Sequence, residues 1–457
     1  MWQTLNKFRI IFMAQSRLGL RKISLNIGAT FACQFLALLL SLATSIIVAR
    51  SLGPVGNGEY SVAMLLPTFL VVFLNLGISS ANVYYVGRHS DSLITAYRAS
   101  ILMWCIVTAL GVGIGGGVIL IGGDQWFPGV PSSVLWFASV LFPLGLLQSY
   151  FASLLQAVQD FKRFNVVAIT SPAIMLFFVF FVFLLKGSVV DVVFAAVLTQ
   201  FVNLIITFLL LHRQISEITR TNVNVSGAEY VMHALRYGYK AHLSNILTFV
   251  NYRADIFLIN LLITPVSAGI YVISVAMSEK LWLISQAVST VILPKLSELH
   301  AEEDVRRQLT PLIARWMLVL VTIAACFFSV LGPCMIKFLF GSEYLGAAVP
   351  FLFLLPGIVL ASITKVLAND IAARGRPELN MYTSFVVIIF NIVGNLYLIP
   401  LWGLPGAAIA TTIAYSVQAA LLVSMYAWLS GNCWHFLFSF GDQDAKILKR
   451  IRIALSR

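Results

Sequence analysis

The chain has 457 residues, of which 60% are hydrophobic and only 11% are charged. A soluble domain carries about 25% charged residues and cannot bury so large an apolar share, because surface-to-volume scaling limits its core. The composition therefore excludes a soluble enzyme and a disordered chain, and it indicates an integral membrane protein. The net charge of +12 would suggest nucleic acid in a soluble protein, but here it follows from membrane topology, and we expect no nucleic-acid partner.

Twelve membrane spans are predicted from apolar stretches of about 20 residues, the length that a bilayer-crossing helix requires. They lie at 24–49, 60–86, 99–122, 134–156, 164–185, 188–211, 240–263, 266–293, 312–336, 347–371, 380–400 and 404–429. The loops are too short for a soluble catalytic domain. The predicted fold is all-α with two six-helix bundles, divided into a basic tail at 1–23, an N-terminal bundle at 24–212, a linker at 213–235, a C-terminal bundle at 236–430 and a second basic tail at 431–457.

Lysine and arginine residues are concentrated in alternate loops. Twenty-four lie in the two tails and the even-numbered loops, three lie in the odd-numbered loops, and three lie inside spans. The positive-inside rule therefore places both termini in the cytoplasm. In both tails apolar residues are mixed with basic ones, which is typical of amphipathic helices on anionic lipid or of a simple topogenic charge cluster.

Two short patterns recur between the halves of the chain. Residues 54–60 and 265–271 share the pattern P-V-x-x-G-x-Y at an offset of 211, and residues 161–165 weakly match 376–380 at an offset of 215. Two matches at nearly one offset indicate duplication of a six-span unit. Because six is even, both copies enter the membrane from the same side. The predicted pseudo-twofold axis then runs along the membrane normal with a cavity between the bundles, as suits alternating access.

Polar residues within the spans recur in steps of three, four and seven, which places each set on one helix face. The sets include Asn26, Thr30 and Gln34 in the first span, Asn75, Ser79 and Asn82 in the second, Asn245, Thr248, Tyr252 and Asp255 in the seventh, and Asn391 and Asn395 in the eleventh. We expect them to line a water-filled cavity. The alternative is that such residues hold helices together, and it applies most to the serine-rich eighth span.

Ionisable residues at membrane depth are the sharpest sign of function, because each costs several kcal/mol unless it is paired or hydrated. The spans contain Arg253, Asp255, Glu279, Lys280, Lys365 and Asp370. Arg253 and Asp255 are about 200° apart around their helix, so they do not pair with each other. One interpretation is a structural pair between Arg253 and Glu279.

The other interpretation of these residues is functional. Arg253, Lys280 and Lys365 would contact an anionic substrate, and Asp255 or Glu279 would be a titratable ion-coupling site. The predicted substrate-binding set adds the polar lining residues Asn245, Tyr252, Gln34 and Asn75.

Motifs of enzyme chemistry are absent from the sequence. It contains no P-loop, no HExxH and no GxSxG, so neither ATP hydrolysis nor a familiar hydrolase site is expected. The five cysteines and six histidines are scattered without metal-ligand spacing. We therefore expect no enzyme activity, no metal site and no cofactor, with a proton or sodium gradient as the candidate driving force.

Residues 251–260 (NYRADIFLIN), 268–276 (AGIYVISVA), Glu279 and 293–297 (LPKLS) resemble the polysaccharide-transport branch of the MOP (MATE-like) exporter superfamily, as does segment 50–60. The resemblance covers essentially the whole chain and identifies the branch better than the substrate. It implies two six-helix bundles that form a V and alternate their access. In the resemblance Arg253 and Asp255 match the family's motif in the seventh span, and Glu279 matches its acid in the eighth.

The cargo that this resemblance implies is an undecaprenyl-pyrophosphate-linked oligosaccharide, moved to the outer leaflet of a bacterial inner membrane for O-antigen, capsule or exopolysaccharide synthesis. A pyrophosphate favours Arg and Lys, and a sugar chain favours Asn, Gln, Ser and aromatic residues. Membrane lipids, a polymerase and glycosyltransferases are the other expected partners. The alternatives are a MATE-type ion-coupled exporter with cavity carboxylates, a lipid II flippase, whose relatives add two spans, and a non-transporting scaffold of a polysaccharide synthase complex.

Overall fold

The computed structural model describes residues 2–88, 93–158, 160–217, 227–282, 285, 303–437, 439–441 and 444, and the regular structure in these residues is helical. This confirms the predicted all-α fold class. The α-helices are α1 (Trp2–Ala63), α2 (Leu65–Leu74), α3 (Ile78–Arg88), α4 (Leu93–Trp126), α5 (Ser132–Ser139), α6 (Leu141–Ala157), α7 (Phe161–Leu184), α8 (Val189–Glu217), α9 (Gly227–Leu262), α10 (Pro265–Glu279), α12 (Glu303–Phe340), α13 (Ala348–Ala373), α14 (Pro377–Trp402) and α15 (Leu404–Ser430), with 3₁₀ helices η3 (Ser342–Ala347) and η4 (Trp434–Leu437). The end of the predicted eighth span and most of the second basic tail lie outside the described residues.

Nine helical stretches of the described residues are long and apolar enough to cross a membrane. The first, Ala32–Leu74, overlaps parts of the first two predicted spans, and the other eight match predicted spans three to six and nine to twelve. α9 is not among the nine, because Arg253, Asp255 and neighbouring asparagines lower its hydropathy. α10 is a short helix of 15 residues. The helices that carry Arg253, Asp255 and Glu279 are thus the ones that apolarity alone would miss.

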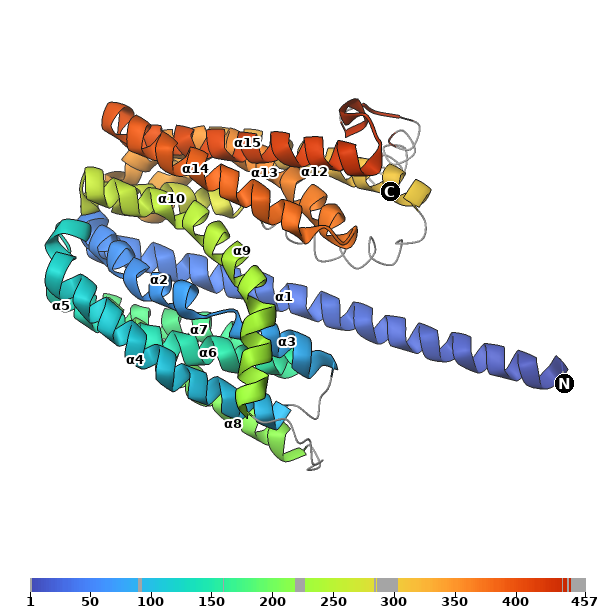
Figure 1. Ribbon diagram of the computed structural model, residues 1–457. Coiled ribbons are helices and arrows are strands. Elements are labelled where there is room, and N and C mark those ends of the chain that lie inside the picture. The colour runs from blue at the N-terminus through green and yellow to red at the C-terminus, as the bar shows by residue number, and fades with distance from the viewer. Residues whose placement is uncertain are drawn as a thin grey trace.

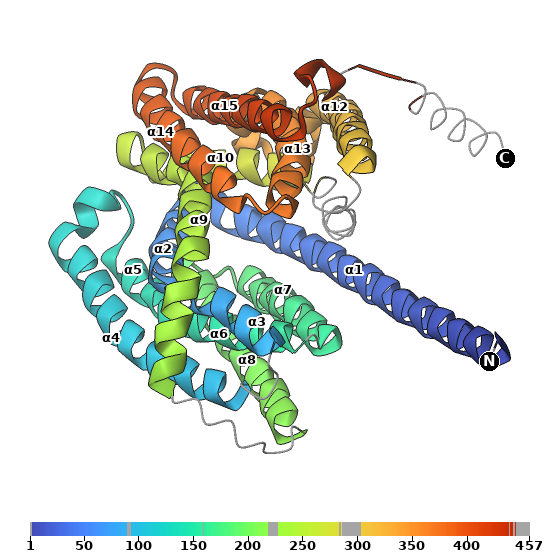
Figure 2. The same cartoon turned by 45° about the vertical axis from the view of Figure 1, so that its right-hand side comes forward.

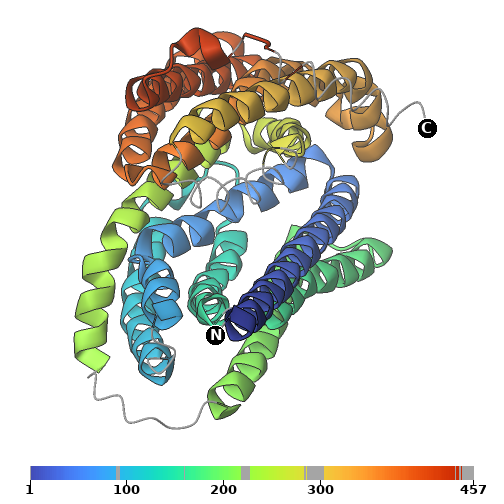
Figure 3. The ribbon, with the colours of Figure 1, turned by 90° about the vertical axis from the view of Figure 1, so that its right-hand side faces the viewer.

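The helices form two groups that lie one above the other in Figure 1. The lower group holds α1 to α8, and the upper group holds α10 and α12 to α15 (Figures 1 and 2). α9 passes from the first group to the second (Figure 3), and it packs against α2, α3 and α4 as well as α10 and α14. The N-terminal end of α1 extends beyond both groups (Figure 2). The predicted tail and first span therefore form one helix.

The first predicted loop, residues 50–59, is largely helical, which corrects that boundary. α1 continues through it and leaves helical geometry at Gly53, whose φ of 64° and ψ of −178° suit glycine. Pro54 follows directly, and proline is favoured at the first position of a helix because its φ is already fixed near the helical value. Gly53 and Pro54 therefore end one span and start the next without a coil.

The second predicted span is divided into several helices. Between α2 and α3, Leu76 and Gly77 have positive φ values of 53° and 74°. Gly77 also lies against Gly238 of α9: a Cβ atom on Gly77 would be 2.3 Å from the Gly238 carbonyl oxygen. The absence of side chains at both glycines lets the N-terminal half of α9 pack directly on this break, so α9 is anchored to the first group.

The two copies of the P-V-x-x-G-x-Y pattern meet where α1 crosses α10. A Cβ atom on Gly58 would lie 1.8 Å from the carbonyl oxygen of Pro265, and one on Gly269 would lie 2.3 Å from the carbonyl oxygen of Pro54. Asn57 Nδ2 donates to the carbonyl oxygen of Gly269 over 3.0 Å. The glycines that the sequence pairs by their repeat thus allow the two groups of helices to touch backbone to backbone.

Further hydrogen bonds join the two groups at this same end of the molecule. The guanidinium of Arg50 donates to the carbonyl oxygens of Phe338 and Leu339 at the end of α12. The hydroxyl of Tyr344 in η3 donates to the carbonyl oxygen of Ala49 over 2.9 Å. These residues belong to or flank the odd-numbered loops, so the joined end is the one that the basic-residue distribution predicts to face away from the cytoplasm.

Candidate functional site

Arg253 and Glu279 form the ion pair that one interpretation of the sequence predicted. Arg253 Nη1 on α9 lies 3.4 Å from Glu279 Oε1 on α10, and the two side chains are 35% and 28% exposed. A guanidinium has five N–H donors, and Glu279 engages one nitrogen. Arg253 therefore remains accessible and retains donors for a second anionic partner.

Asp255 lies in a different environment from Arg253, as the helix geometry predicted. Its side chain is buried, with only 3% of the residue exposed. Asp255 Oδ2 accepts a hydrogen bond from the hydroxyl of Tyr271 over 3.0 Å, and Oδ1 accepts one from the backbone N–H of Ile256 over 2.8 Å. Tyr271 is the last residue of the second P-V-x-x-G-x-Y copy. The repeated motif thus positions the buried carboxylate.

Buried asparagines on α9 and on α14, which pack together, leave polar atoms unsatisfied. Each has at least one side-chain atom with no hydrogen-bond partner among the described residues: Asn251, Asn260, Asn391 and Asn395. Buried polar groups normally find a partner, so atoms of this kind suit ordered water or a small ion. The polar face predicted for the eleventh span is therefore buried against another helix.

Lys365 lines a polar cavity of about 180 Å³ in the second group of helices. The described lining residues come from α9, α13, α14 and α15 together with Trp282, and Lys365 is the one charged side chain among them. The rings of Tyr252 and Trp282 lie 4.9 Å apart between centroids, and Tyr415 lies 5.8 Å from Trp282. The structure thus brings together Lys365 and Tyr252, two of the residues predicted to bind substrate.

The remaining predicted residues are dispersed. Lys280 is the C-cap of α10, next to Glu279, and forms no ion pair with the side chains that the structure describes. Gln34 on α1 and Asn245 on α9 are exposed, and neither lines the Lys365 cavity. Asn75 caps α2, where its Nδ2 donates to the hydroxyls of Ser79 over 3.0 Å and Ser149 over 3.1 Å. Asn75 therefore belongs to a separate cluster in the first group.

A hydroxyl-rich cavity of about 460 Å³ lies beside this cluster in the first group of helices. Its described lining comes from α3, α6 and α7: Ser79, Ser80, Val83, Ser149, Ala152, Ser153, Gln156 and Phe164. The α6 residues were missed in the sequence. The available signal was the spacing of Ser149, Ser153 and Gln156, which places three polar side chains on one face of an apolar helix.

A second set of hydrogen bonds fixes the wall of this cavity. Asn82 Nδ2 donates to the hydroxyls of Ser100 and Ser153, each over 3.1 Å. The hydroxyl of Tyr230, at the start of α9, donates to Asn82 Oδ1 over 2.9 Å. Burial raises the pKa of Tyr230 above its usual range, so the hydroxyl stays protonated and can donate. The wall is therefore polar, uncharged and held by four helices.

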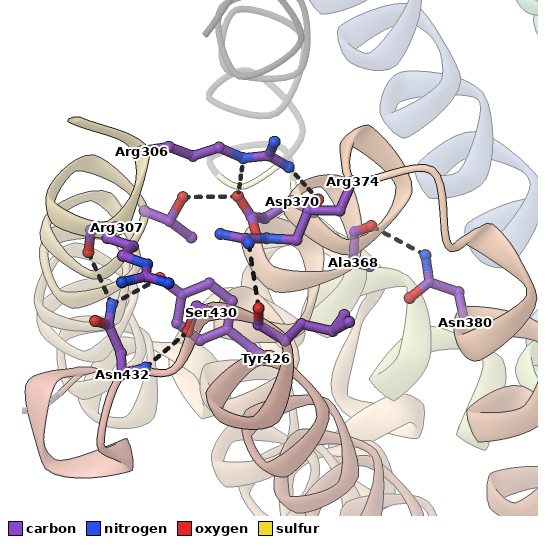
Figure 4. Close-up of polar contacts among 11 residues, drawn as sticks. Arg306, Arg307, Ala368, Asp370, Arg374, Asn380, Tyr426, Ser430 and Asn432 are labelled. Carbon is purple, nitrogen blue, oxygen red and sulfur yellow. Dashed lines mark hydrogen bonds and ion pairs between the residues drawn. The ribbon is translucent and has the colours of Figure 1, made fainter. Parts of the chain in front are cut away.

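Asp370, one of the ionisable residues within the predicted spans, is paired in the structure. It lies near the end of α13, and Figure 4 shows its contacts: Oδ1 accepts from Arg306 Nε over 2.9 Å, and Oδ2 accepts from Arg374 Nε over 2.6 Å. Thr310 also donates to Oδ1, over 3.0 Å. The side chains of Arg306 and Asp370 are 2% and 0% exposed. Two arginines thus neutralise this carboxylate and tie α12 to α13, so it is structural.

An apolar cavity of about 300 Å³ lies between α2, α4 and α9. Its described lining contains leucine, isoleucine, valine, phenylalanine and tryptophan, without a polar side chain. Phe257 of α9 contacts Phe69 and Phe127 edge to face, with ring centroids 6.1 and 5.8 Å apart. The face of α9 that carries Phe257 therefore packs in an apolar environment.

Comparison with known proteins agrees with this arrangement. Residues 47–349 match the model of a family described as polysaccharide biosynthesis protein. A putative O-antigen transporter of Shigella flexneri is 22% identical over 404 residues, which cover 83% of this chain and 91% of the relative. A probable low-salt glycan biosynthesis flippase of Haloferax volcanii is 24% identical over 170 residues, and that match spans 36% of each protein.

Solved structures show the same fold. The lipid II flippase MurJ in an inward closed conformation superposes with a TM-score of 0.70 at 16% identity and covers 93% of this chain and 96% of its own. An inward-facing multidrug resistance MATE family transporter of the MOP superfamily has a TM-score of 0.67 at 13% identity, with 89% and 98% coverage. The fold implied by the resemblance to the MOP exporters is therefore confirmed.

Proposed function

Since the chain belongs to the polysaccharide biosynthesis protein family, we propose that it is a flippase that moves a lipid-linked oligosaccharide across a membrane by alternating access. The chain is a multi-pass membrane protein with the fold of MOP transporters. The family match is supported by relatives named as an O-antigen transporter and a glycan biosynthesis flippase. The proposed cargo is an undecaprenyl-pyrophosphate-linked oligosaccharide.

The observation that carries this proposal is the excess of accessible cationic groups near α9 and α10. With Asp370 neutralised by Arg306 and Arg374, the intramembrane bases Arg253, Lys280 and Lys365 outnumber Asp255 and Glu279. A pyrophosphate needs such cations, whereas a MATE-type exporter of cations would need carboxylates to dominate. The balance of charge therefore favours an anionic cargo over that alternative.

The direction of access follows from the charge of the loops. If the basic loops lie in the cytoplasm, the end at which α1 meets α10 and η3 faces outward. The two groups are then joined on the outer side, as expected of a flippase waiting for cargo from the cytoplasmic leaflet. We extend the proposal to a bacterial inner membrane with both termini cytoplasmic, and to a polymerase and glycosyltransferases as partners in the pathway.

Deleting the gene tests this function. The lipid-linked oligosaccharide should accumulate on the cytoplasmic leaflet and surface polysaccharide should disappear, and the wild-type gene should restore both. Leaflet location can be measured in spheroplasts with a membrane-impermeant lectin. Normal surface polysaccharide in the deletion strain would contradict the proposal. A strain that flips the lipid but cannot polymerise it would instead favour the scaffold alternative.

Ion coupling through Asp255 or Glu279 is part of the same proposal, with Asp255 the better candidate because Glu279 is paired with Arg253. One elementary charge moved through 100 mV is worth about 2.3 kcal/mol, which would shift a leaflet distribution about fiftyfold. In wild-type proteoliposomes a proton or sodium gradient should change the distribution of the cargo, and Asp255→Asn should abolish that response. The control is Asp191→Asn, since Asp191 is exposed and caps α8 through Ser188. A response that survives in Asp255→Asn would remove Asp255 from coupling.

A further inference from the structure

The two polar cavities, one in each group of helices, are each lined by a helix face at the same position in the repeated unit. On α6 the first cavity is lined by Ser149, Ala152, Ser153 and Gln156. On α13 the second is lined by Ala361, Thr364, Lys365 and Ala368. Each member of the first set lies 212 residues before its counterpart in the second. Steps of three and four residues are common to any helix face that lines a cavity. The offset of 212 residues between the two faces is specific, because it falls between the offsets of 211 and 215 of the repeated sequence patterns.

The neighbouring helices extend this equivalence. The weaker repeat, residues 161–165 and 376–380, forms the starts of α7 and α14. α7 contributes Phe164 to the first cavity, and α14 contributes Asn380 to the second. A twofold axis between the halves would place such cavities symmetrically about it. The two cavities therefore share two equivalent walls whose side chains differ, while their other walls come from α3 in the first cavity and from α9 and α15 in the second.

The divergence is one of charge. The position of Ser153 in the first cavity is taken by Lys365 in the second, and that of Gln156 is taken by Ala368. The described lining of the first cavity is uncharged and contains hydroxyl and amide groups, each of which both donates and accepts hydrogen bonds. That lining matches sugar hydroxyls, which also do both. A lysine is a compact cation with three donors and no acceptor, and it matches a phosphate.

We propose that the two cavities divide the cargo: the first, built on α6, binds sugar residues and determines which oligosaccharide is accepted, and the second, built on α13, binds the pyrophosphate. This inference rests on the proposed function. The volume of about 460 Å³ at the first cavity is within the usual range for small-ligand sites. The smaller cavity of about 180 Å³ needs to hold only an anionic group beside Lys365.

Two substitutions test the division, and each uses the residue found at the equivalent position of the other half. Gln156→Ala changes an exposed side chain and leaves the buried network of Asn82 intact. Lys365→Ser removes the cation, and Lys365→Arg keeps it as a control. Binding is measured on the full chain in nanodiscs with two probes: undecaprenyl pyrophosphate, and the oligosaccharide-bearing lipid extracted from cells that lack the gene. Thermal unfolding of each variant reports whether it is folded.

Lys365→Ser should lower the affinity for both probes about tenfold or more, because both probes carry the pyrophosphate and a charge-assisted contact to it is lost. Gln156→Ala should lower the affinity for the oligosaccharide-bearing probe alone, about three- to tenfold, because a neutral hydrogen bond to the sugar is lost. Equal effects of Gln156→Ala on both probes, or none on either, would overturn the division. So would a Lys365→Ser protein that is folded and still binds both probes normally.

The failure of the proposed function is distinguishable from the failure of this inference. A wild-type chain that binds neither probe would overturn both. A wild-type chain that binds both probes and flips the oligosaccharide-bearing lipid, but whose Gln156→Ala variant is unchanged, would overturn the division alone.

Discussion

Replacing Arg253 by alanine should reduce translocation of the lipid-linked oligosaccharide at least about tenfold while the protein remains folded in the membrane. The Arg253 side chain is 35% exposed and uses one guanidinium nitrogen to contact Glu279, so its other donors are available to a pyrophosphate. Loss of a hydrogen bond to a charged group costs about 1.5–3 kcal/mol, which corresponds to a factor of about ten to a hundred. Arg253→Lys should also be impaired, because an ammonium cannot reproduce the planar fork of donors. Surface polysaccharide and protein level are measured together.

The structural interpretation of the same pair makes a different prediction. If Arg253 served only to neutralise Glu279, Glu279→Gln would be as harmful as Arg253→Ala, and the double variant would recover, because no unpaired charge would remain. We expect Glu279→Gln to retain most activity and the double variant to stay inactive. Recovery in the double variant would show that Arg253 is structural. Normal export in Arg253→Ala alone would remove it from the mechanism altogether.

Replacing Gly58 by alanine should destabilise the protein by about 3 kcal/mol or more and abolish transport. The new Cβ atom would lie 1.8 Å from the carbonyl oxygen and 2.6 Å from the carbonyl carbon of Pro265. These are backbone atoms, so no side-chain rotation can relieve the clash, and α1 and α10 must separate. Overpacking usually costs about 1–3 kcal/mol where side chains can adjust, and here they cannot. Thermal unfolding in detergent measures the loss.

Gly113→Ala is the matched control, because Gly113 lies within α4 and a Cβ atom there would meet nothing within 4 Å. In a helix interior alanine is favoured over glycine by roughly 0.5–1 kcal/mol, so this variant should be as stable as the wild type or slightly more so. If Gly58→Ala has the same unfolding temperature as Gly113→Ala and still transports, the backbone contact between the repeated motifs is not required for stability or transport.

Helix periodicity predicted the features that depend on one helix. Nine apolar helical stretches of the described residues overlap ten of the twelve spans predicted from apolar length. The angle between Arg253 and Asp255 correctly predicted that the two side chains do not pair, but Asp255, which was expected to line a water-filled cavity, is buried against Tyr271. The repeated sequence pattern also marks a contact between the two groups of helices, because Gly58 and Gly269, at equivalent positions of the pattern, lie against each other. These predictions succeeded because the spacing along a helix determines which way a side chain points.

Features that depend on distant segments could not be predicted in this way. The pairing of Asp370 was not predicted, because its partner Arg306 is 64 residues away and was assigned to a loop. The cavity on α6 was missed because its polar residues are few and its walls come from three helices. Gly53 was placed in a loop, although glycine followed by proline can join two helices directly. In each case the decisive contact is set by packing rather than by local sequence.

The central claim, that this chain moves a lipid-linked oligosaccharide across the membrane, is tested most directly with purified protein. Proteoliposomes are loaded with the oligosaccharide-bearing lipid extracted from cells that lack the gene, and a membrane-impermeant lectin is added outside. With wild-type protein, the lipid that starts in the inner leaflet should become accessible to the lectin, whereas in vesicles without protein or with Arg253→Ala it should stay protected. Equal protection in wild-type and protein-free vesicles would contradict the account.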